Sequence, residues 1–550
     1  MKHPYNNLEN FTLPGLLSRS LKLYKELDAF GFVGEKAMSY ATFSLKVKET
    51  IELLRKNGIT KGDKILLLSE NMPHWSVAYF ATTSLGAVIV PVLPDFHPSD
   101  VHHILRHSES KAVFVSEKHL ETIEDSANEH IKFVINLENL VLIDELTHKS
   151  HKTSASLAQK PIVLEDDLAA IIYTSGTTGH SKGVMLSHKN LTTNAISSYA
   201  KVSILPSDVF LSILPLAHTL ECTVGLLVPI LHGSSVYYLD KAPTPSALLK
   251  AFEIVKPTMM LSVPLIIEKI YKSKILPKFS SSALMRAIYK ISFFRKFLNK
   301  IAGKKLIETF GGRMRFYGIG GAALSPFVEQ FLIEAKFPYI IGYGLTETAP
   351  LLAGSVLGDK VKIKSTGTAF PGVKIKIHDK NSETGEGEII IQSPGLMMGY
   401  YKDEEKTKEL IKDGWFHTGD LGYMDEDGFL FISGRSKNVI IGAGGENIYP
   451  EQLESIITQN NAVMEALVLE QNGKLVARIH LDYALMDKMF HADKTPDAKV
   501  REDIANYLET TRLDFNSKVS SFSRISKFIE QREAFVKTPT KKIKRYLYTE

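Results

Sequence analysis

Short apolar runs alternate with longer amphipathic stretches through the first third of the chain. The apolar runs are rich in branched side chains and predict strands, which span Lys64 to Leu68, Ala87 to Val90, Ala112 to Val115 and Ile131 to Ile135. Helical patterns cover Pro73 to Leu85 and Pro98 to His107. Strands that alternate with helices in this way predict parallel sheets covered by helices, so we expect an α/β fold.

The pattern changes after Glu383, where strand runs are broken by Gly and Asp-Gly turns in SETGEGEIIIQSPG and MDEDGFLFISGR. Such turns favour antiparallel hairpins and a small barrel-like part. Beyond Arg435 a shorter segment repeats strand and helix patterns, with a helix from Pro450 to Thr458 and a strand from Glu465 to Leu469. We therefore predict a large domain over residues 1–434 and a small α+β domain over 435–550.

Length and composition fit an ordinary globular protein of at least two domains, because the chain has 550 residues, of which 44% are apolar and 23% charged. They exclude wholesale disorder, collagen-like repeats and coiled coil. The net charge of only +5 gives no reason to expect a nucleic-acid partner. A single cysteine, Cys222, and a start without a secretory apolar run favour the cytoplasm. The most apolar stretch, Val209 to Leu231, carries polar and proline residues and is interpreted as a buried loop and helix.

A glycine-rich segment, YTSGTTGHSKG at Tyr173 to Gly183, follows the predicted strand Leu168 to Tyr173 directly. Glycine lets backbone amides face one concavity, hydroxyls add donors, and Lys182 adds a positive charge, so the segment suits phosphate oxygens. It differs from a Walker A loop, in which Gly precedes the lysine and Ser or Thr follows it. The alternative is a solvated Ser/Thr/Gly turn.

Two further segments place polar or small residues after apolar runs. YGLTET, at Tyr343 to Thr348, sets a hydroxyl beside a carboxylate. This pair suits a Mg²⁺ ion that bridges the protein and nucleotide phosphates. The alternative is a glutamate that is only solvated. GIGGAA, at Gly318 to Ala323, would let a flat ring approach the backbone, or would pack a strand tightly on a helix.

Nearer the C-terminus, WFHTGDLG places Asp420 between glycine-flanked turns, where its carboxylate could accept from two ribose hydroxyls. The segment Gly434 to Lys437 then connects the two predicted domains. Lys542 lies in the basic run KTPTKKIKR, which by itself resembles an ordinary charged tail.

Taken together in this order and spacing, these motifs resemble those of the adenylate-forming superfamily of acyl-CoA synthetases, over about Lys36 to Arg545. YTSGTTGHSKG is similar to the superfamily's phosphate loop, YGLTET to its adenylate motif and WFHTGD to its ribose motif. GRSKNVIIGAGGENIYPEQLE is similar to its hinge motif and TPTKKIKR to its C-terminal lysine motif. Two departures stand out: Ser181 occupies a position where proline is common, and Lys541 one where glycine is common.

The resemblance implies a role for each matching residue. The residues that would hold the ATP phosphates are Thr174, Ser175, Gly176, Thr177, Thr178, Gly179 and Lys182. Those that would flank the adenine are Gly320, Gly321, Ala322 and Tyr343, and those that would hold the ribose are Asp420 and Arg435. Thr346 would contact the adenylate phosphate, Glu347 would bind Mg²⁺, and Lys542, rather than Lys541, would be the catalytic lysine. Lys437 would be the hinge of a mobile small domain.

The reaction that the resemblance implies has two half-reactions in one site. A carboxylate attacks the α-phosphate of ATP and releases pyrophosphate, and the small domain then rotates so that the CoA thiol attacks the acyl adenylate and AMP leaves. Both organic reactants are anions, so the site must be electropositive to bring them together.

The segment LPLAHTLE, at Leu214 to Glu221, resembles that of long-chain fatty acyl-CoA synthetases and implies that His218 lies beside an acyl channel. A buried structural histidine is the alternative. Cys222 is interpreted as a small core residue. We therefore expect a medium-chain or long-chain fatty acid as the substrate; aryl acids remain a further possibility.

A basic segment, Lys269 to Lys305, holds eleven Lys or Arg and no Asp or Glu, interleaved with aliphatic and aromatic residues. It predicts peripheral contact with an anionic membrane, at its inner face, or else a solvated helical face packed on the core. Oligomeric state stays open, with a homodimer as one expectation from the superfamily.

Three other functions compete with the CoA ligase. One keeps the adenylation but loads the acyl group onto a carrier-protein thiol. Another is a phosphotransferase or ATPase, which the departure from the Walker A pattern disfavours. The last is a non-catalytic acyl or nucleotide binder, which the joint presence of Lys182, Glu347, Asp420 and Lys542 disfavours.

Overall fold

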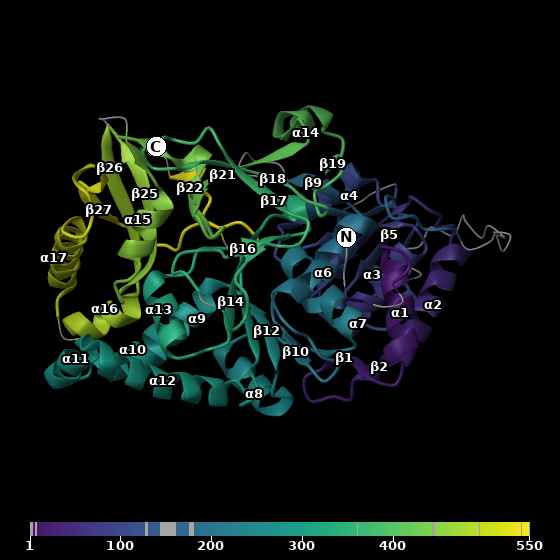
Figure 1. Ribbon diagram of the computed structural model, residues 1–550, viewed down its shortest axis with the longest axis horizontal. Helices are drawn as coiled ribbons and strands as arrows, with labels where there is room; N and C mark the ends of the chain where they lie inside the picture. The colour runs from purple at the N-terminus through teal and green to yellow at the C-terminus, as the bar shows by residue number, and fades with distance from the viewer. Residues whose placement is uncertain are drawn as a thin grey trace. The chain divides into compact units, whose positions relative to one another are not determined.

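The computed structural model describes residues 4–5, 8–126, 130–143, 161–174, 181–359, 361–442, 446–493, 495–540 and 542–548. The chain divides into two compact units (Figure 1). The first comprises residues 1–375, 391–416 and 426–430, and the second comprises 376–390, 417–425 and 431–550. Each unit is described in turn.

An eight-stranded sheet in the first unit has the order β19-β9-β8-β4-β3-β5-β6-β7. Its strands are β3 (Lys64–Leu68), β4 (Val88–Val92), β5 (Ala112–Val115), β6 (Phe133–Asn136), β7 (Val141–Leu142), β8 (Leu168–Thr174), β9 (Lys182–Ser187) and β19 (Gly399–Tyr400). Strands β8, β4, β3, β5 and β6 run parallel, whereas β7, β9 and β19 pair antiparallel at the two edges. The strands predicted from apolar runs all lie in this parallel centre.

A nine-stranded sheet in the same unit has the order β16-β15-β14-β13-β12-β10-β11-β1-β2. Its strands are β1 (Asp28–Phe32), β2 (Met38–Ser39), β10 (Val209–Ser212), β11 (Ser235–Tyr238), β12 (Met259–Ser262), β13 (Phe316–Ile319), β14 (Tyr339–Gly344), β15 (Leu351–Gly354) and β16 (Thr368–Ala369). The run from β1 to β14 is parallel, and β2, β15 and β16 are antiparallel edge strands.

Helix α3 (Pro73–Ser84) contacts β1 of one sheet and β3 and β4 of the other, so it lies between the two sheets. Its residues from Trp75 to Ser84 are all buried, which explains why the sequence there shows little polar patterning. The other helices before residue 256 are α1 (Leu13–Tyr24), α2 (Tyr40–Lys56), α4 (Pro98–Ser108), α5 (Leu120–Glu124), α6 (His188–Ser197), α7 (Val228–His232) and α8 (Pro245–Val255).

The apolar stretch 209–231 contains β10, a π-helical segment Glu221–Leu227 and most of α7. Every residue of the π-helical segment is buried. The interpretation of this stretch as a buried loop and helix is thus close to the structure. No helix in the described ranges combines the length and apolar character needed to cross a bilayer.

The basic segment 269–305 folds into a series of helices beside the nine-stranded sheet. They are α9 (Pro264–Ile270), a π-helical turn Tyr271–Ile275, α10 (Leu276–Ser280), α11 (Ala283–Lys290) and α12 (Ser292–Thr309), followed after β13 by α13 (Pro326–Glu334). Tyr271, Ile275 and Phe279 enter the core that α13 and the sheet form. The N-terminal half of the segment is therefore anchored in the interior.

The five-stranded sheet holds β17 (Lys374–His378), β18 (Gly387–Gln392), β21 (Trp415–Met424) and β20 (Ile411–Lys412) in that order, with β22 (Leu430–Arg435) paired to β21. Helix α14 (Glu404–Leu410) precedes β20. Beyond it, the second unit holds a three-stranded sheet of β25 (Val463–Gln471), β26 (Lys474–Leu481) and β27 (Lys527–Glu530), and a two-stranded sheet of β23 (Ile440–Ile441) and β24 (Asn447–Ile448).

Helices α15 (Pro450–Ile457), α16 (Tyr483–Phe490) and α17 (Asp497–Asn516) complete the second unit. Leu453, Leu508 and Phe515 from these helices share one apolar core with Ala477 and Ile479 of β26. The unit therefore has its own interior, with helices and a mixed sheet. The predicted α/β class, with parallel-rich sheets and a smaller α+β part, is confirmed, while the domain boundary at residue 434 stays a prediction.

Candidate active site

The strands β8 and β9 frame the predicted phosphate loop. Thr174 ends β8, Lys182 begins β9, and the two are partners in the antiparallel ladder. The predicted loop residues Ser175, Gly176, Thr177, Thr178 and Gly179 lie outside the described residues. Position 183 packs so closely on β8 that a Cβ atom there would come within 2.8 Å of Ile171 Cγ2, which explains why glycine occupies it. The described strands thus hold both ends of the loop at one sheet edge.

Tyr400 links the lysine of this loop to the glutamate of the YGLTET motif. Strand β19 pairs with β9, so that Tyr400 is the register partner of Val184. The Lys182 ammonium lies 5.5 Å from the centre of the Tyr400 ring, and the Tyr400 hydroxyl donates to Glu347 Oε1 at 2.8 Å. A cation and a carboxylate from distant segments are therefore held by one aromatic side chain.

The turn that carries Thr346 and Glu347 follows β14 directly. Gly344 is required at its start, because a Cβ there would come within 1.7 Å of Pro350 O. Asn194, on α6, donates to Thr348 O at 2.9 Å and accepts from the Leu351 amide at 2.9 Å. Both contacts are buried, so the turn has a fixed position relative to α6 and β9.

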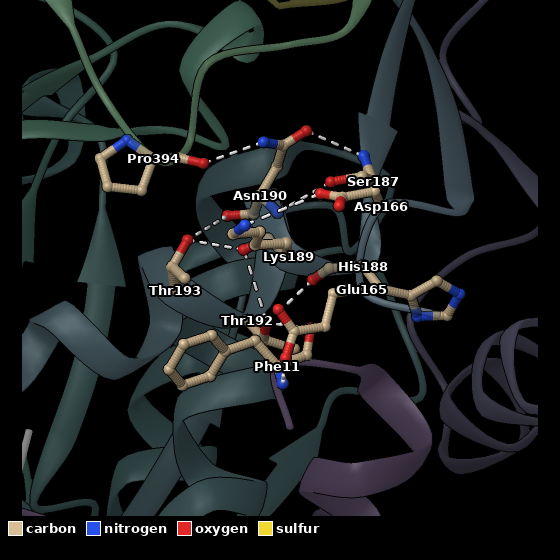
Figure 2. A network of polar contacts seen from close by, with 10 residues as sticks. All are labelled: Phe11, Glu165, Asp166, Ser187, His188, Lys189, Asn190, Thr192, Thr193 and Pro394. Carbon is tan, nitrogen blue, oxygen red and sulfur yellow. Dashed lines mark hydrogen bonds and ion pairs between the residues drawn. The ribbon is translucent and has the colours of Figure 1, made fainter. Parts of the chain in front are cut away.

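Two distant parts of the chain fix helix α6 (Figure 2). At its N-terminus Ser187 and Asn190 form a reciprocal capping box, and Asn190 Nδ2 donates to Pro394 O at 2.9 Å. On the next turn the Thr192 hydroxyl donates to Phe11 O at 2.7 Å. Because β9 leads directly into α6, this network also fixes the end of the phosphate loop.

His218 lies in the connection between β10 and the π-helical segment and is partly exposed. Its Nδ1 accepts from the Leu220 amide at 3.2 Å. The Leu220 side chain comes close to Gly320, where a Cβ would meet it at 2.9 Å, and the Thr223 hydroxyl donates to Ala349 O at 2.9 Å. The His218 segment is thus held against the predicted adenine segment and against the turn of Glu347.

The predicted adenine residues lie at neighbouring carboxyl ends of two parallel strands. Gly320 to Ala322 follow β13, and Tyr343 lies near the end of β14, with Ile319 paired to Ile341. Gly321 has φ of +87°, and Gly321 and Ala322 are exposed whereas Gly320 and Tyr343 are buried. The ends of parallel strands are where ligands commonly bind in open α/β sheets.

A second carboxyl group lies deep beside this region. Glu221, at the start of the π-helical segment, is 1% exposed, and Ser212 donates to its Oε1 at 2.6 Å. Its Oε2 finds no hydrogen-bond partner among the described residues. Burial raises the pKa of Glu221 to about 8, although the Ser212 hydrogen bond lowers it. Burial also raises the pKa of the neighbouring Cys222 thiol to about 12. Cys222 is buried, as expected of a small core residue.

In the second unit, the structure brings Asp420 and Arg435 together. Asp420 Oδ1 lies 2.6 Å from Arg435 Nε, and the Asp420 side chain is buried while that of Arg435 is partly exposed. The Asp420 amide donates to the Thr418 hydroxyl, and the Gly419 amide donates to Glu388 Oε1 at 3.0 Å. Asp420 therefore has fixed partners, but it lies within the continuous strand β21, so the glycine-flanked turns predicted around it are wrong.

Lys437 and Lys542 are both exposed. Lys542 lies on a short antiparallel turn closed by Lys537 and Ile543, and Thr538 bonds its backbone at both the amide and the carbonyl. An ion pair from Lys537 to Glu465 fixes the turn to β25. The backbone that carries Lys542 is therefore fixed within the second unit.

Comparison with known proteins decides the family. The family model described as AMP-binding enzyme matches residues 17–401. The peroxisomal long chain acyl-CoA synthetase 7 of Arabidopsis thaliana is 30% identical over 497 residues, which cover 83% of this chain and 70% of that protein. The chain belongs to the AMP-binding enzyme family.

A second relative supports this membership, and a solved structure supports the fold. The long-chain-fatty-acid–CoA ligase heimdall of Drosophila melanogaster is 29% identical over 81% of this chain and 72% of its own length. The O-succinylbenzoate coenzyme A synthetase of Bacillus subtilis, solved with ATP and magnesium ion, has a TM-score of 0.74 at 22% identity, covering 96% and 98% of the two chains. The superfamily predicted from the ordered motifs is therefore confirmed, and so is the fold.

Two residues of this AMP-binding protein escaped the sequence reasoning. Tyr400 follows Gly399 in the run GLMMGYY, which carries no chemical signature, and only the pairing of β19 with β9 brings it to Lys182 and Glu347. Glu221 ends the motif LPLAHTLE, in which the family resemblance implies a role for His218 only. A polar residue that begins an otherwise apolar stretch was the available signal for Glu221.

Proposed function

We propose that the protein activates a medium-chain or long-chain fatty acid with ATP and transfers the acyl group to CoA. The chain is an AMP-forming acid:CoA ligase, which its family and its relatives support. The observation that carries the proposal is the junction at Tyr400, where Lys182 of the phosphate loop and Glu347 of the adenylate motif meet. A positive charge for phosphate and a carboxylate for a divalent cation are what the reaction needs in one place.

Charge repulsion is the main obstacle to the first step. Two unit anions at 4 Å repel by about 4 kcal/mol at an effective dielectric near 20. Lys182 and the amides of the phosphate loop offset this repulsion on the phosphates. Lys542 adds a mobile positive charge as pyrophosphate departs.

The donor set at the turn fits Mg²⁺. Glu347 offers a partly exposed carboxylate, Thr346 offers a hydroxyl, and both are hard oxygen ligands. The described residues hold no group of three or more His, Cys, Asp or Glu side chains for a metal ion, which suits a cation shared with substrate phosphates. Bound there by Glu347, Mg²⁺ would supply Lewis-acid screening of the phosphate charge.

The reaction then proceeds in two displacements. A carboxylate oxygen of the fatty acid attacks the α-phosphorus of ATP, the bond from that phosphorus to the bridging oxygen breaks, and pyrophosphate leaves with the electron pair. The CoA sulfur then attacks the acyl carbon, the bond to the AMP oxygen breaks, and the thiol proton is released to solvent. Acyl-CoA and AMP are the products.

The remaining predicted residues take their places in this scheme. Gly320 to Ala322 and Tyr343 flank the adenine, while the Asp420–Arg435 pair holds the ribose. His218 lies beside the acyl channel, close to the turn of Glu347. Lys437 is the hinge, and the large domain of residues 1–434 stays in place while residues 435–550 rotate.

The proposal also covers the acyl acceptor, the cellular location and the oligomeric state. CoA is the acceptor, and the rival acceptor is a carrier-protein thiol, which the same residues would also serve. We place the enzyme in the cytoplasm, peripherally at the inner face of the membrane through residues 269–305. A homodimer is a further expectation, which sedimentation equilibrium would test.

The decisive assay follows pyrophosphate and AMP release from ATP with Mg²⁺ across acids from acetate to oleate, with and without CoA. We expect acid-dependent pyrophosphate release that becomes rapid turnover only with CoA and is fastest with medium or long chains. Release that ignores CoA would favour the carrier-protein ligase. Release of ADP, or no acid-dependent product, would overturn the adenylation reaction.

A pair of variants tests the assignment of the catalytic lysine. Lys542→Ala should lose the adenylation step by at least about 100-fold, the scale for loss of one group that stabilises transition-state charge, while thioester formation from preformed acyl adenylate is retained. Lys541→Ala, at the neighbouring position, serves as the matched control and should retain adenylation. The reverse pattern would move the catalytic role to Lys541.

A further inference from the structure

Helices α11 and α12, drawn in teal in Figure 1, follow one another directly and contact each other, and the two faces that they present differ sharply. One face is fixed to the protein by polar contacts and close packing. The other presents large apolar side chains and lysines to solvent. The contrast matters because isolated exposed apolar residues are ordinary, whereas a contiguous group marks an interaction surface.

The inner face is anchored to α13. Arg295 donates to both carboxylate oxygens of Glu334, at 2.9 to 3.2 Å, and Asn299 donates to Glu334 Oε2 at 2.8 Å. Gly303, two turns from Arg295, lies so close to α13 that a Cβ there would come within 2.5 Å of Ala335 O. Helix α12 therefore cannot turn its apolar outer residues inward without breaking the half-buried ion pair between Arg295 and Glu334.

The outer face carries apolar side chains at helical spacing. Phe293, Phe297 and Ile301 follow one another at every fourth position of α12 and are 75%, 58% and 54% exposed. With three neighbours they make up what we call the α11–α12 face: Leu284, Ile291, Phe293, Phe294, Phe297 and Ile301. No residue of this face is less than 46% exposed.

Positive charge surrounds this face. The exposed basic side chains of the segment are Lys269, Lys274, Lys278, Arg286, Lys290, Lys296, Lys300, Lys304 and Lys305. Between Lys269 and Lys305 the sequence has no acidic residue. Lys296, Lys300 and Lys304 recur along α12 at every fourth position, beside the apolar row.

We propose that the α11–α12 face docks on the surface of an anionic lipid bilayer. The phenylalanine rings and aliphatic side chains would enter the boundary between headgroups and acyl chains, while the lysines would remain among anionic headgroups. Charge complementarity favours an anionic bilayer over other binding partners. A second copy of the chain would bring like charges together, and a nucleic acid would leave Leu284, Ile291 and Ile301 without apolar contact.

Docking deepens the peripheral membrane contact included in the proposed function and rests on that part of it. It can be tested apart from the ligase reaction, because lipid binding can be measured without substrates. Its benefit to a fatty-acid ligase would be access to an acid that dissolves in membranes. The side chains involved differ from those assigned to ATP, Mg²⁺ and the acyl channel.

Vesicle flotation of the full chain tests the proposal. Wild-type protein should bind vesicles of phosphatidylcholine mixed with phosphatidylglycerol and bind pure phosphatidylcholine much more weakly. The variant Lys290→Glu, Lys296→Glu, Lys300→Glu, Lys304→Glu should lose at least about 100-fold in partition coefficient, since each lysine near the surface contributes about fivefold. Arg295 is left intact because it anchors α12 to α13.

A second variant and a control separate lipid docking from misfolding. Phe293→Ser, Phe297→Ser should lose about 10-fold or more in partition with no change of charge. Four exposed lysines at α1 and α2 give the matched charge control, Lys22→Glu, Lys25→Glu, Lys48→Glu, Lys56→Glu, which should bind as wild type does. Circular dichroism and pyrophosphate release with a short, water-soluble acid should be unchanged in all three.

Three results would overturn the proposal. One is equal partition of wild type and the lysine variant. Another is a dimer that dissociates on Phe293→Ser, Phe297→Ser, which would make the face an interface between copies. The last is salt-sensitive binding to nucleic acid that exceeds binding to anionic vesicles. An inactive enzyme that still binds vesicles through this face would contradict the proposed ligase reaction alone.

Discussion

Glu347 and Glu221 lie in the same unit, each in a motif that the sequence marks, yet their surroundings are opposite. Glu347 lies on a partly exposed turn, with the Tyr400 hydroxyl on one oxygen and the Lys182 ammonium beyond the same ring. Glu221 is buried in a π-helical segment, with Ser212 on one oxygen and no partner among the described residues on the other.

The difference shows that position relative to water, and not residue type, decides what a carboxyl group can do. A carboxylate open to solvent can exchange water for a cation and phosphate oxygens. A carboxyl group without water or a counter-ion keeps its proton instead, and burial raises the pKa of Glu221 to about 8. Glu347 is therefore suited to metal binding and Glu221 is not.

The strongest test of this contrast replaces the charge at Glu347. Glu347→Gln should retain the hydrogen bond from Tyr400, because the amide oxygen still accepts, but it removes the anionic ligand. Acid-dependent pyrophosphate release should fall by about 100-fold or more, and the Mg²⁺ concentration for half-maximal rate should rise. The measurement is a Mg²⁺ titration of the initial rate.

Glu253→Gln, on the exposed surface of α8, provides the control for loss of one negative charge and should behave as wild type. If Glu347→Gln reduced the rate by less than about threefold and left the Mg²⁺ dependence unchanged, the turn would not be the cation site. The two glutamates would then differ in burial without differing in role.

Much of the scaffold behind this contrast was predictable from the sequence. Strands β3 and β5 have the bounds that their apolar runs predicted, because a fully buried parallel strand must be apolar on both faces. The pairing of β19 with β9 was not predictable, since its two strands are far apart in the sequence and the pairing depends on the whole fold. Tyr400 was missed for this reason.

The candidate site was predictable to a similar degree. Ordered motifs identified Lys182, Glu347, Asp420 and Lys542, because glycine, hydroxyl and charged residues in a set order leave a clear pattern. The protonation of Glu221 left no such pattern, because it arises from burial by residues of several segments. The composition of residues 269–305 predicted an amphipathic, basic surface on α11 and α12. The ion pair of Arg295 with Glu334, which points Arg295 inward, could be found only in the structure.

The second prediction tests the neutral state of Glu221. Below pH 4.5 the carboxyl is protonated in the folded and the unfolded chain; between 4.5 and about 8 only the folded chain keeps the proton. The free energy of unfolding of wild type should therefore fall as pH rises through this window, by up to about 1.4 kcal/mol per pH unit. Glu221→Gln lacks this titration, so it should gain stability relative to wild type between pH 5 and pH 8.

Urea unfolding of wild type and Glu221→Gln at several pH values checks this expectation, since other titrating groups cancel in the difference. Glu253→Gln again serves as control and should show a difference that does not change with pH, because its side chain is exposed. A pH-independent difference for Glu221→Gln as well would mean that Glu221 is ionised in the folded protein. The contrast with Glu347 would then fail.

The smallest expected effect concerns Tyr400, the side chain that gives Glu347 its fixed orientation. Tyr400→Phe keeps the ring beside Lys182 but removes the hydroxyl that donates to Glu347 Oε1 at 2.8 Å. A hydrogen bond to a charged group contributes about 1.5 kcal/mol or more, so Mg²⁺ should be needed at about tenfold higher concentration while the maximal rate changes little. Tyr401→Phe is the neighbouring control. An effect on the maximal rate alone, with the Mg²⁺ dependence unchanged, would mean that Tyr400 acts through Lys182 and the phosphates. Glu347, the more exposed of the two glutamates, would then need no partner to position its carboxylate for Mg²⁺.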